Sequence, residues 1–251
     1  MMTIADLSST YLEQREHDWT AFASSSADLP DYWAWWDDYS AGWRIPIQFL
    51  QPVGSEYTEQ FAPLAELMEQ LGALDEVVVP PLSWVHMTYI HIGFLRPTDV
   101  LWSQVESFYV NAAPRIRRVE PFTIQIGGLS ISEDGRIYVG MDDGGVYREL
   151  RRQIGLGVPF ITQKMKDDPL ITAEGDAFVP TMDIGFTTGQ GSRKRLINLL
   201  EEHRSIDLGE ISPPNMKLAR IPIQPYDHYL DIDVVAEVPL LGADHRKGYH
   251  N

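Results

Sequence analysis

Two residues in the first half of the chain, His86 and Thr88, have types and a spacing that suit the binding of a phosphate group. In a β-strand, side chains two residues apart leave the same face, about 7 Å from each other. An imidazole transfers protons near neutral pH, and a hydroxyl donates hydrogen bonds to phosphoryl oxygens. Because His-x-Thr triplets also occur where the histidine is structural, the spacing alone leaves both interpretations open.

The elements that must position these two side chains follow from apolar spacing and turn residues. Residues 83–95 are predicted to form a strand that ends before Arg96 and Pro97. Asp134 and Gly135 predict a tight turn between two strands. The predicted strands are 44–50, 77–79, 83–95, 121–131, 136–141, 177–187, 207–211, 216–223 and 229–239, and the predicted helices are 61–71, 98–111, 143–154 and 192–203. This order, with several hairpin-length links, favours an α+β fold with antiparallel sheets over a doubly wound parallel sheet.

The N-terminal residues 1–43 are predicted to form a helical extension that Pro30 divides into two pieces. Its second piece is rich in aromatic residues, namely Tyr32, Trp33, Trp35, Trp36, Tyr39 and Trp43. Such a cluster either packs against the main body or provides a platform on which bases stack. We predict that the main body spans residues 44–241 and that residues 242–251 form a polar tail.

The composition limits the partners of the chain. With 36 acidic and 20 basic residues, the formal charge is −16, which repels long nucleic acids and anionic membrane surfaces. No apolar run approaches the roughly 20 residues that span a bilayer, and the chain has no cysteine for disulfides or thiol chemistry. We therefore expect a cytoplasmic protein with a small ligand. No cofactor or metal is expected, and the sequence does not indicate an oligomeric state.

The stretch 84–94, WVHMTYIHIGF, resembles the first motif of the 2'-5' RNA ligase-like and cyclic nucleotide phosphodiesterase proteins of the 2H phosphoesterase superfamily. Residues 122–129 and 136–141 resemble the middle segment of these proteins, and residues 218–220 and 234–240 resemble their closing strands. The resemblance implies a bilobed fold of two antiparallel sheets and flanking helices around a central cleft. Two His-x-Thr motifs would face each other there, one histidine as base and the other as acid, without a metal.

The second motif departs from the family pattern. Its expected place is occupied by Thr181-x-Asp183, which lacks the histidine. Asp183 would act as the second acid or base if burial raised its pKa towards neutrality, whereas a charged carboxylate would repel a phosphodiester. His228 is another candidate to replace the missing imidazole. Arg220 stands where the family often has a cleft arginine, so the resemblance implies a phosphate contact.

Two functions that involve phosphate remain open at this stage, besides chemistry unrelated to phosphate in a repurposed cleft. The first is a metal-independent phosphodiesterase or cyclic phosphodiesterase that acts on a small nucleotide-like substrate. In such a phosphodiesterase, His86 would transfer one proton, and Asp183 or His228 would transfer the second. Thr88 and Thr181 would bind the phosphoryl oxygens. The second is a catalytically inactive module of the same fold that binds a phosphorylated ligand.

Overall fold

The computed structural model of the protein describes residues 9–34, 45–95, 101–142, 145–157, 181–221, 223–224, 228–229 and 232–243. The helices are α1 (Ser9–Ser24), α3 (Ala62–Gly72), the short 3-10 helix η2 (Leu82–Trp84), α4 (Trp102–Ile116), α5 (Val146–Gly157) and α7 (Arg193–His203). The strands are β1 (Ile45–Pro52), β2 (Val77–Val78), β3 (His86–Leu95), β4 (Ile124–Ile131), β5 (Arg136–Asp142), β6 (Thr181–Thr187), β7 (Asp207–Ile211), β8 (Asn215–Arg220), β9 (Ile223–Gln224), β10 (His228–Tyr229) and β11 (Asp233–Pro239).

An antiparallel sheet organises the molecule, as the order of elements predicts. Among the described residues, nine strands form one sheet in the order β11-β8-β1-β3-β6-β5-β4-β7, with β2 paired to β6. We call the part from β11 to β3 the first lobe and the part from β6 to β7 the second lobe. In the described part of the chain, the strand pairing between the lobes consists of Met87 of β3 opposite Met182 of β6, and buried apolar side chains of both lobes pack together around it. The two predicted sheets therefore meet edge to edge.

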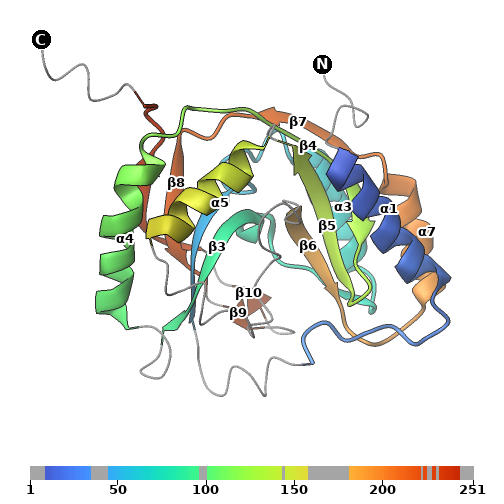
Figure 1. Ribbon diagram of the computed structural model, residues 1–251. Helices are drawn as coiled ribbons and strands as arrows, with labels where there is room; N and C mark the ends of the chain where they lie inside the picture. Colours follow the sequence, from blue (N-terminus) through green and yellow to red (C-terminus); the bar gives the residue numbers. More distant parts are fainter. Residues whose placement is uncertain are drawn as a thin grey trace, which may run out of the picture.

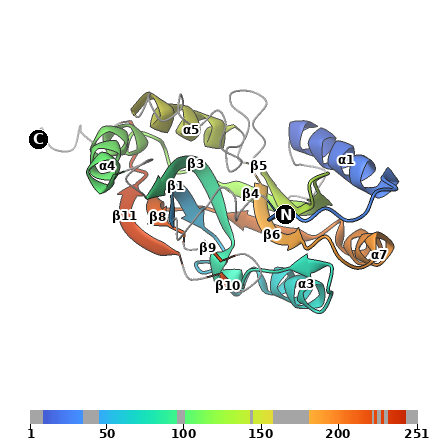
Figure 2. The ribbon, with the colours of Figure 1, turned by 90° about the horizontal axis from the view of Figure 1, so that it is seen from below.

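The helices are divided between the lobes (Figure 1). Helices α4 and α5 contact each other, and they contact β11 and β3 of the first lobe, respectively. Helices α3 and α7 contact the second lobe, and α1 lies on the opposite side of that lobe's strands (Figure 2). No helix in the described ranges is long and apolar enough to cross a membrane.

Most predicted elements are confirmed, and the boundary of α4 is the clearest difference. The helix was expected over 98–111, but it runs from Trp102 to Ile116. Its buried side continues with Ala112 and Ile116 at helical spacing, so packing extends the helix past the predicted end. Residues 96–100, where the predicted start falls, lie outside the described residues.

The N-terminal extension is helical only in part. Helix α1 is present, but residues 31–34 form a bridge and a turn, so the prediction of a helix there was wrong. Asp31 pairs with Thr188 in an isolated bridge, and the Tyr32 amide donates to the Thr187 carbonyl oxygen at 3.0 Å. These strand-like hydrogen bonds take the place of helical ones. The aromatic residues Trp35, Trp36, Tyr39 and Trp43 lie outside the described residues.

Helix α1 packs closely on β4 and β5 of the second lobe. The buried Tyr11 donates its hydroxyl to the Gly128 carbonyl oxygen at 2.6 Å. The Tyr138 hydroxyl of β5 donates to Asp18 of α1 at 2.7 Å. A Cβ atom built on Gly140 would lie 1.7 Å from Cζ of the Tyr11 ring. The absence of a side chain at position 140 therefore allows α1 to approach the sheet.

Gly140→Ala is expected to lower the free energy of unfolding by about 1–3 kcal/mol, because the added methyl overlaps the buried Tyr11 ring. Urea unfolding at neutral pH measures this loss. Gly72→Ala is the matched control, since its Cβ would meet only the Val79 Cβ at 4.0 Å. Equal free energies of unfolding for the two variants would show that the packing of α1 does not require a glycine at position 140.

Candidate functional site

The contact between β3 and β6 brings the two predicted motifs onto one face of the sheet. Met87 and Met182 are fully buried and lie opposite each other. Side chains alternate along a strand, so the neighbours of these methionines leave the other face. These neighbours are the four predicted motif residues, His86, Thr88, Thr181 and Asp183. We call this surface the motif face.

On the first lobe, His86 is held in one tautomer. Its Nδ1–H donates to the Trp84 carbonyl oxygen at 2.5 Å, and the two rings are in edge contact at 4.6 Å. Burial lowers the pKa of His86 to about 4, although the hydrogen bond to Trp84 opposes this shift. The imidazole is therefore neutral at pH 7 with its lone pair on Nε2. Among the described residues, Nε2 has no hydrogen-bond partner.

Thr88 is oriented by Gln48 of β1. The Thr88 hydroxyl donates to Gln48 Oε1 at 2.6 Å, and the Gln48 side chain is only 6% exposed. The sequence did not single out Gln48, although a buried amide among apolar strand residues is a recognisable signal. This contact fixes the direction of the Thr88 hydroxyl on the motif face.

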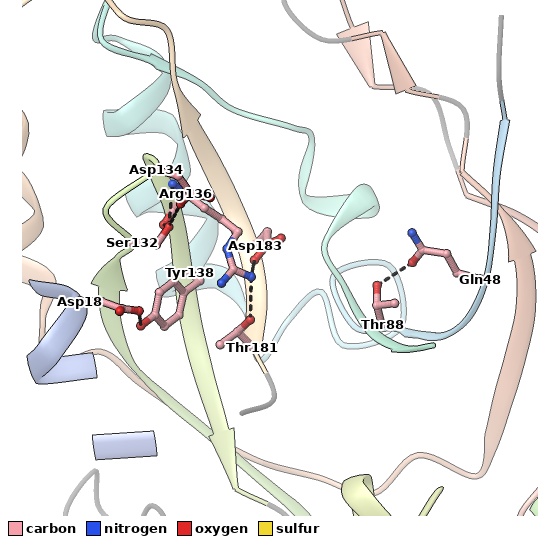
Figure 3. Close-up of polar contacts among 9 residues, drawn as sticks. All are labelled: Asp18, Gln48, Thr88, Ser132, Asp134, Arg136, Tyr138, Thr181 and Asp183. Carbon is pink, nitrogen blue, oxygen red and sulfur yellow. Dashed lines mark hydrogen bonds and ion pairs between the residues drawn. The ribbon is translucent and has the colours of Figure 1, made fainter. Parts of the chain in front are cut away.

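On the second lobe, Arg136 of β5 holds the incomplete motif together (Figure 3). Its Nη1 donates to the Thr181 hydroxyl at 3.3 Å and to Asp183 Oδ1 at 3.2 Å. Burial raises the pKa of the Asp183 carboxyl, and the nearby guanidinium opposes this rise. Arg136 was predicted only as the start of a hairpin strand. Its role depends on the pairing of β5 with β6, which the sequence does not show.

The two halves of the site differ in charge and lie apart. Figure 3 shows Thr88 and Gln48 on one side and the group around Arg136 on the other. The first half carries a neutral imidazole and a hydroxyl, and the second half carries a guanidinium paired with a carboxyl group. Within the described ranges, no cluster of three or more His, Cys, Asp or Glu residues could hold a metal ion.

Solved structures of other proteins share this arrangement. Protein TT0787 of Thermus thermophilus aligns with a TM-score of 0.56 and 14% identity, over 79% of this chain and 98% of its own. LigT of E. coli, crystallised with NADP+, aligns with a TM-score of 0.55 and 9% identity, over 79% and 99% of the two chains. A conserved protein of unknown function from Agrobacterium tumefaciens aligns with a TM-score of 0.55 and 11% identity, over 86% and 98%. No protein-family model and no curated protein sequence matches the chain.

TT0787 and LigT belong to the 2H phosphoesterase superfamily. The chain has the 2H phosphoesterase fold. At these low identities the similarity concerns the fold alone. The α+β class and the antiparallel sheet that the sequence predicted are thereby confirmed, and the activity has to be argued from the residues of this chain.

Two further predicted site residues, Arg220 and His228, are not among the residues of the motif face in this 2H phosphoesterase fold. Arg220 lies opposite the buried Ile47 in the pairing of β8 with β1, and it forms an ion pair with Asp233 of β11. Its guanidinium is 5.9 Å from the Trp102 ring of α4. The structure thus places Arg220 beside α4 and not with Arg136, so we leave it out of the site. His228 starts β10, and its side chain lies outside what the structure describes.

A cavity of about 430 Å³ lies elsewhere, at the end of α4 and beside α5. Its lining includes two arginines and two glutamates, namely Arg115, Arg118, Glu120 and Glu149. None of the motif residues lines it. Because its charges are balanced, the cavity does not indicate a class of ligand.

The burial of His86 makes a prediction for stability. Its pKa is about 4 in the folded chain and near 6.5 when exposed, so the unfolded state binds more protons between these values. The free energy of unfolding therefore falls as the pH drops from 6.5 towards 4, by at most about 3 kcal/mol. Urea unfolding across this pH range should show a steeper loss for the wild type than for His86→Gln. Parallel curves for the two proteins would contradict a depressed pKa.

Proposed function

We propose that this chain hydrolyses a small nucleotide-like phosphodiester or cyclic phosphate by acid–base chemistry on the motif face. One observation supports the proposal most strongly. The neutral, oriented His86 lies on the same strand face as Thr181 and Asp183, which Arg136 holds in place. A proton acceptor and a positively charged group on one face are what cleavage of a phosphate ester requires.

In this proposal His86 is the general base. Its Nε2 accepts a proton from a water molecule whose oxygen attacks phosphorus. The bond between phosphorus and the leaving ribose oxygen breaks, and that oxygen receives a proton. Asp183 is the proposed donor of this proton in its protonated form, which burial favours by raising the pKa of the carboxyl group and which the ion pair with Arg136 opposes. His228 remains an alternative donor.

Arg136 is the proposed anchor for the phosphoryl group. Only Nη1 is engaged with Thr181 and Asp183, and within the described part of the chain Nε and Nη2 have no hydrogen-bond partner. A guanidinium binds phosphate through two parallel hydrogen bonds. The Thr181 hydroxyl accepts from Arg136 and would add a donor, whereas the Thr88 hydroxyl would donate to phosphate only by giving up its hydrogen bond to Gln48. The anchor replaces part of what the missing histidine would supply.

The size of the substrate is part of the proposal. LigT of E. coli has been crystallised with ATP and with 3'-AMP. By analogy we propose a ligand of nucleotide size for this chain. The net charge of −16 also disfavours long nucleic acids, since each added phosphate increases the repulsion.

Turnover assays test the proposal directly. Purified protein is incubated with 2',3'-cyclic nucleotides and with 2'-5'-linked dinucleotides, and the products are separated by chromatography. The expected result is hydrolysis of at least one class, with the same rate in the presence of a chelator. Absence of turnover for every substrate would overturn the proposed hydrolysis.

A second candidate function is a module that binds phosphorylated ligands without reaction. The observation that favours it is the ion pair between Arg136 and Asp183 on the second lobe, the part of the motif face that we call the second half-site. This ion pair makes the Asp183 carboxyl a weaker proton donor. Titration calorimetry with 3'-AMP separates the two functions. Binding of 3'-AMP together with an absence of turnover favours the module.

A further inference from the structure

The N-terminal segment brings an aromatic residue to the second half-site. The Tyr32 ring stacks on Phe186 of β6 with centroids 4.7 Å apart and an angle of 28° between the planes. Its backbone amide is bonded to the Thr187 carbonyl oxygen at 3.0 Å. Phe186 lies opposite Arg136 in the pairing of β5 with β6. Tyr32 is thus fixed at the end of β6, beside the residue that anchors the incomplete motif.

A neighbouring tryptophan holds this ring in place. Trp33 is 2% exposed, and its ring meets Tyr32 and Phe186 edge-on, at 4.9 Å from each. Phe186 in turn lies 6.2 Å from the Trp84 ring, and Trp84 contacts His86. A continuous group of aromatic rings therefore connects Tyr32 to both halves of the site. Edge-to-face and stacked contacts of this kind restrict the ring to one orientation.

The Tyr32 hydroxyl is a donor near the charged groups of the second half-site. Burial and the carboxylate of Asp183 raise the pKa of the phenol, whereas Arg136 lowers it. The net rise keeps the hydroxyl protonated at neutral pH. In the ranges that the structure describes, this hydroxyl has no hydrogen-bond partner, and it is not among the buried polar atoms without partners. Tyr32 is partly exposed, so a ligand that reaches this edge of the second lobe can contact it.

We propose that Tyr32 donates its hydroxyl to the phosphoryl group of the substrate, beside Arg136, as a residue of the second half-site. This inference rests on the proposed function. It assigns to the N-terminal extension a direct part in the site, in addition to the packing of Tyr32 and Trp33 on the main body. The second half of the site then has a neutral donor that comes from outside the main body.

The test removes only the hydroxyl. Tyr32→Phe keeps the ring stacked on Phe186, so the melting temperature should match the wild type. The kcat/KM for the hydrolysed phosphodiester is expected to fall roughly 10- to 100-fold, because a hydrogen bond to a charged group is lost. Tyr109→Phe is the matched control, since the Tyr109 hydroxyl donates to the Glu237 carbonyl oxygen at 3.5 Å, away from the site.

Binding separates a contact with phosphate from a structural role. Tyr32→Phe should raise the Kd for 3'-AMP roughly 10-fold or more and leave the Kd for adenosine unchanged, because only 3'-AMP carries the phosphoryl group. Equal kcat/KM and equal Kd for 3'-AMP in Tyr32→Phe and wild type would overturn the role of Tyr32 alone. A wild type that neither hydrolyses the substrates nor binds 3'-AMP or inorganic phosphate would overturn both this inference and the proposed function.

Discussion

His86→Gln is expected to lower kcat/KM for the hydrolysed phosphodiester by roughly 10²- to 10⁴-fold, the usual contribution of a general base. Glutamine is of similar size, and its amide can donate to the Trp84 carbonyl oxygen that now accepts from Nδ1. It cannot accept a proton from water. The loss should therefore appear in kcat with little change in KM, and steady-state kinetics on the preferred substrate measures it.

The pH profile gives an independent check on the same residue. Because the pKa of His86 is about 4, the base is already deprotonated at neutral pH, and wild-type activity should persist down to about pH 5. The control is His17→Gln, since the His17 side chain is 76% exposed on α1. Activity of His86→Gln equal to that of His17→Gln would rule out His86 as the base.

Arg136→Met is expected to raise KM by roughly 10- to 100-fold, since a methionine cannot bind a phosphoryl oxygen and no longer holds Thr181 and Asp183. The same change should lower the free energy of unfolding, because the Asp183 carboxylate would lose its charged partner. Kinetics and urea unfolding on one preparation measure both effects. Arg118→Met is the matched control, as Arg118 is exposed at the end of α4.

A second substitution separates binding from stability. In Arg136→Met combined with Asp183→Asn, the unpaired charge is gone, so the free energy of unfolding should recover at least partly. Because Asp183 is also the proposed proton donor, binding is compared through the Kd for 3'-AMP, which should stay raised in both variants since the phosphate anchor is still missing. A Kd that returned to the wild-type value in the double variant would show that Arg136 acts only by neutralising Asp183.

The parts of the fold that could be predicted are those encoded locally. The turn at Asp134 and Gly135 is confirmed between β4 and β5, and Ser192 caps α7 by accepting from the Arg195 amide. His86 and Thr88 were recognisable because a two-residue spacing decides which side chains share a face of one strand. Their standing as catalytic residues is still a prediction.

The contacts that complete the site depend on pairings between strands. Arg136 reaches Thr181 only because β5 pairs with β6, and Gln48 reaches Thr88 only because β1 pairs with β3. Register irregularities in both pairs shift the residues that meet, and alternation along a single strand does not reveal them. The strand that carries Arg220 was predicted, but its ion pair with Asp233 depends on the pairing of β8 with β11, which the sequence does not show.

The pairing of β1 with β8 also sets an order in which the molecule can be completed during synthesis. Strands β4 to β7 of the second lobe come from one stretch, 124–211, whereas the first lobe pairs β1 and β3 with β8 and β11 from 215–239. During synthesis on the ribosome, the edge of β1 that pairs with β8 stays unpaired until β8 has left the ribosome. An exposed edge of this kind is a site for mispairing, so chains truncated before Asn215 should aggregate.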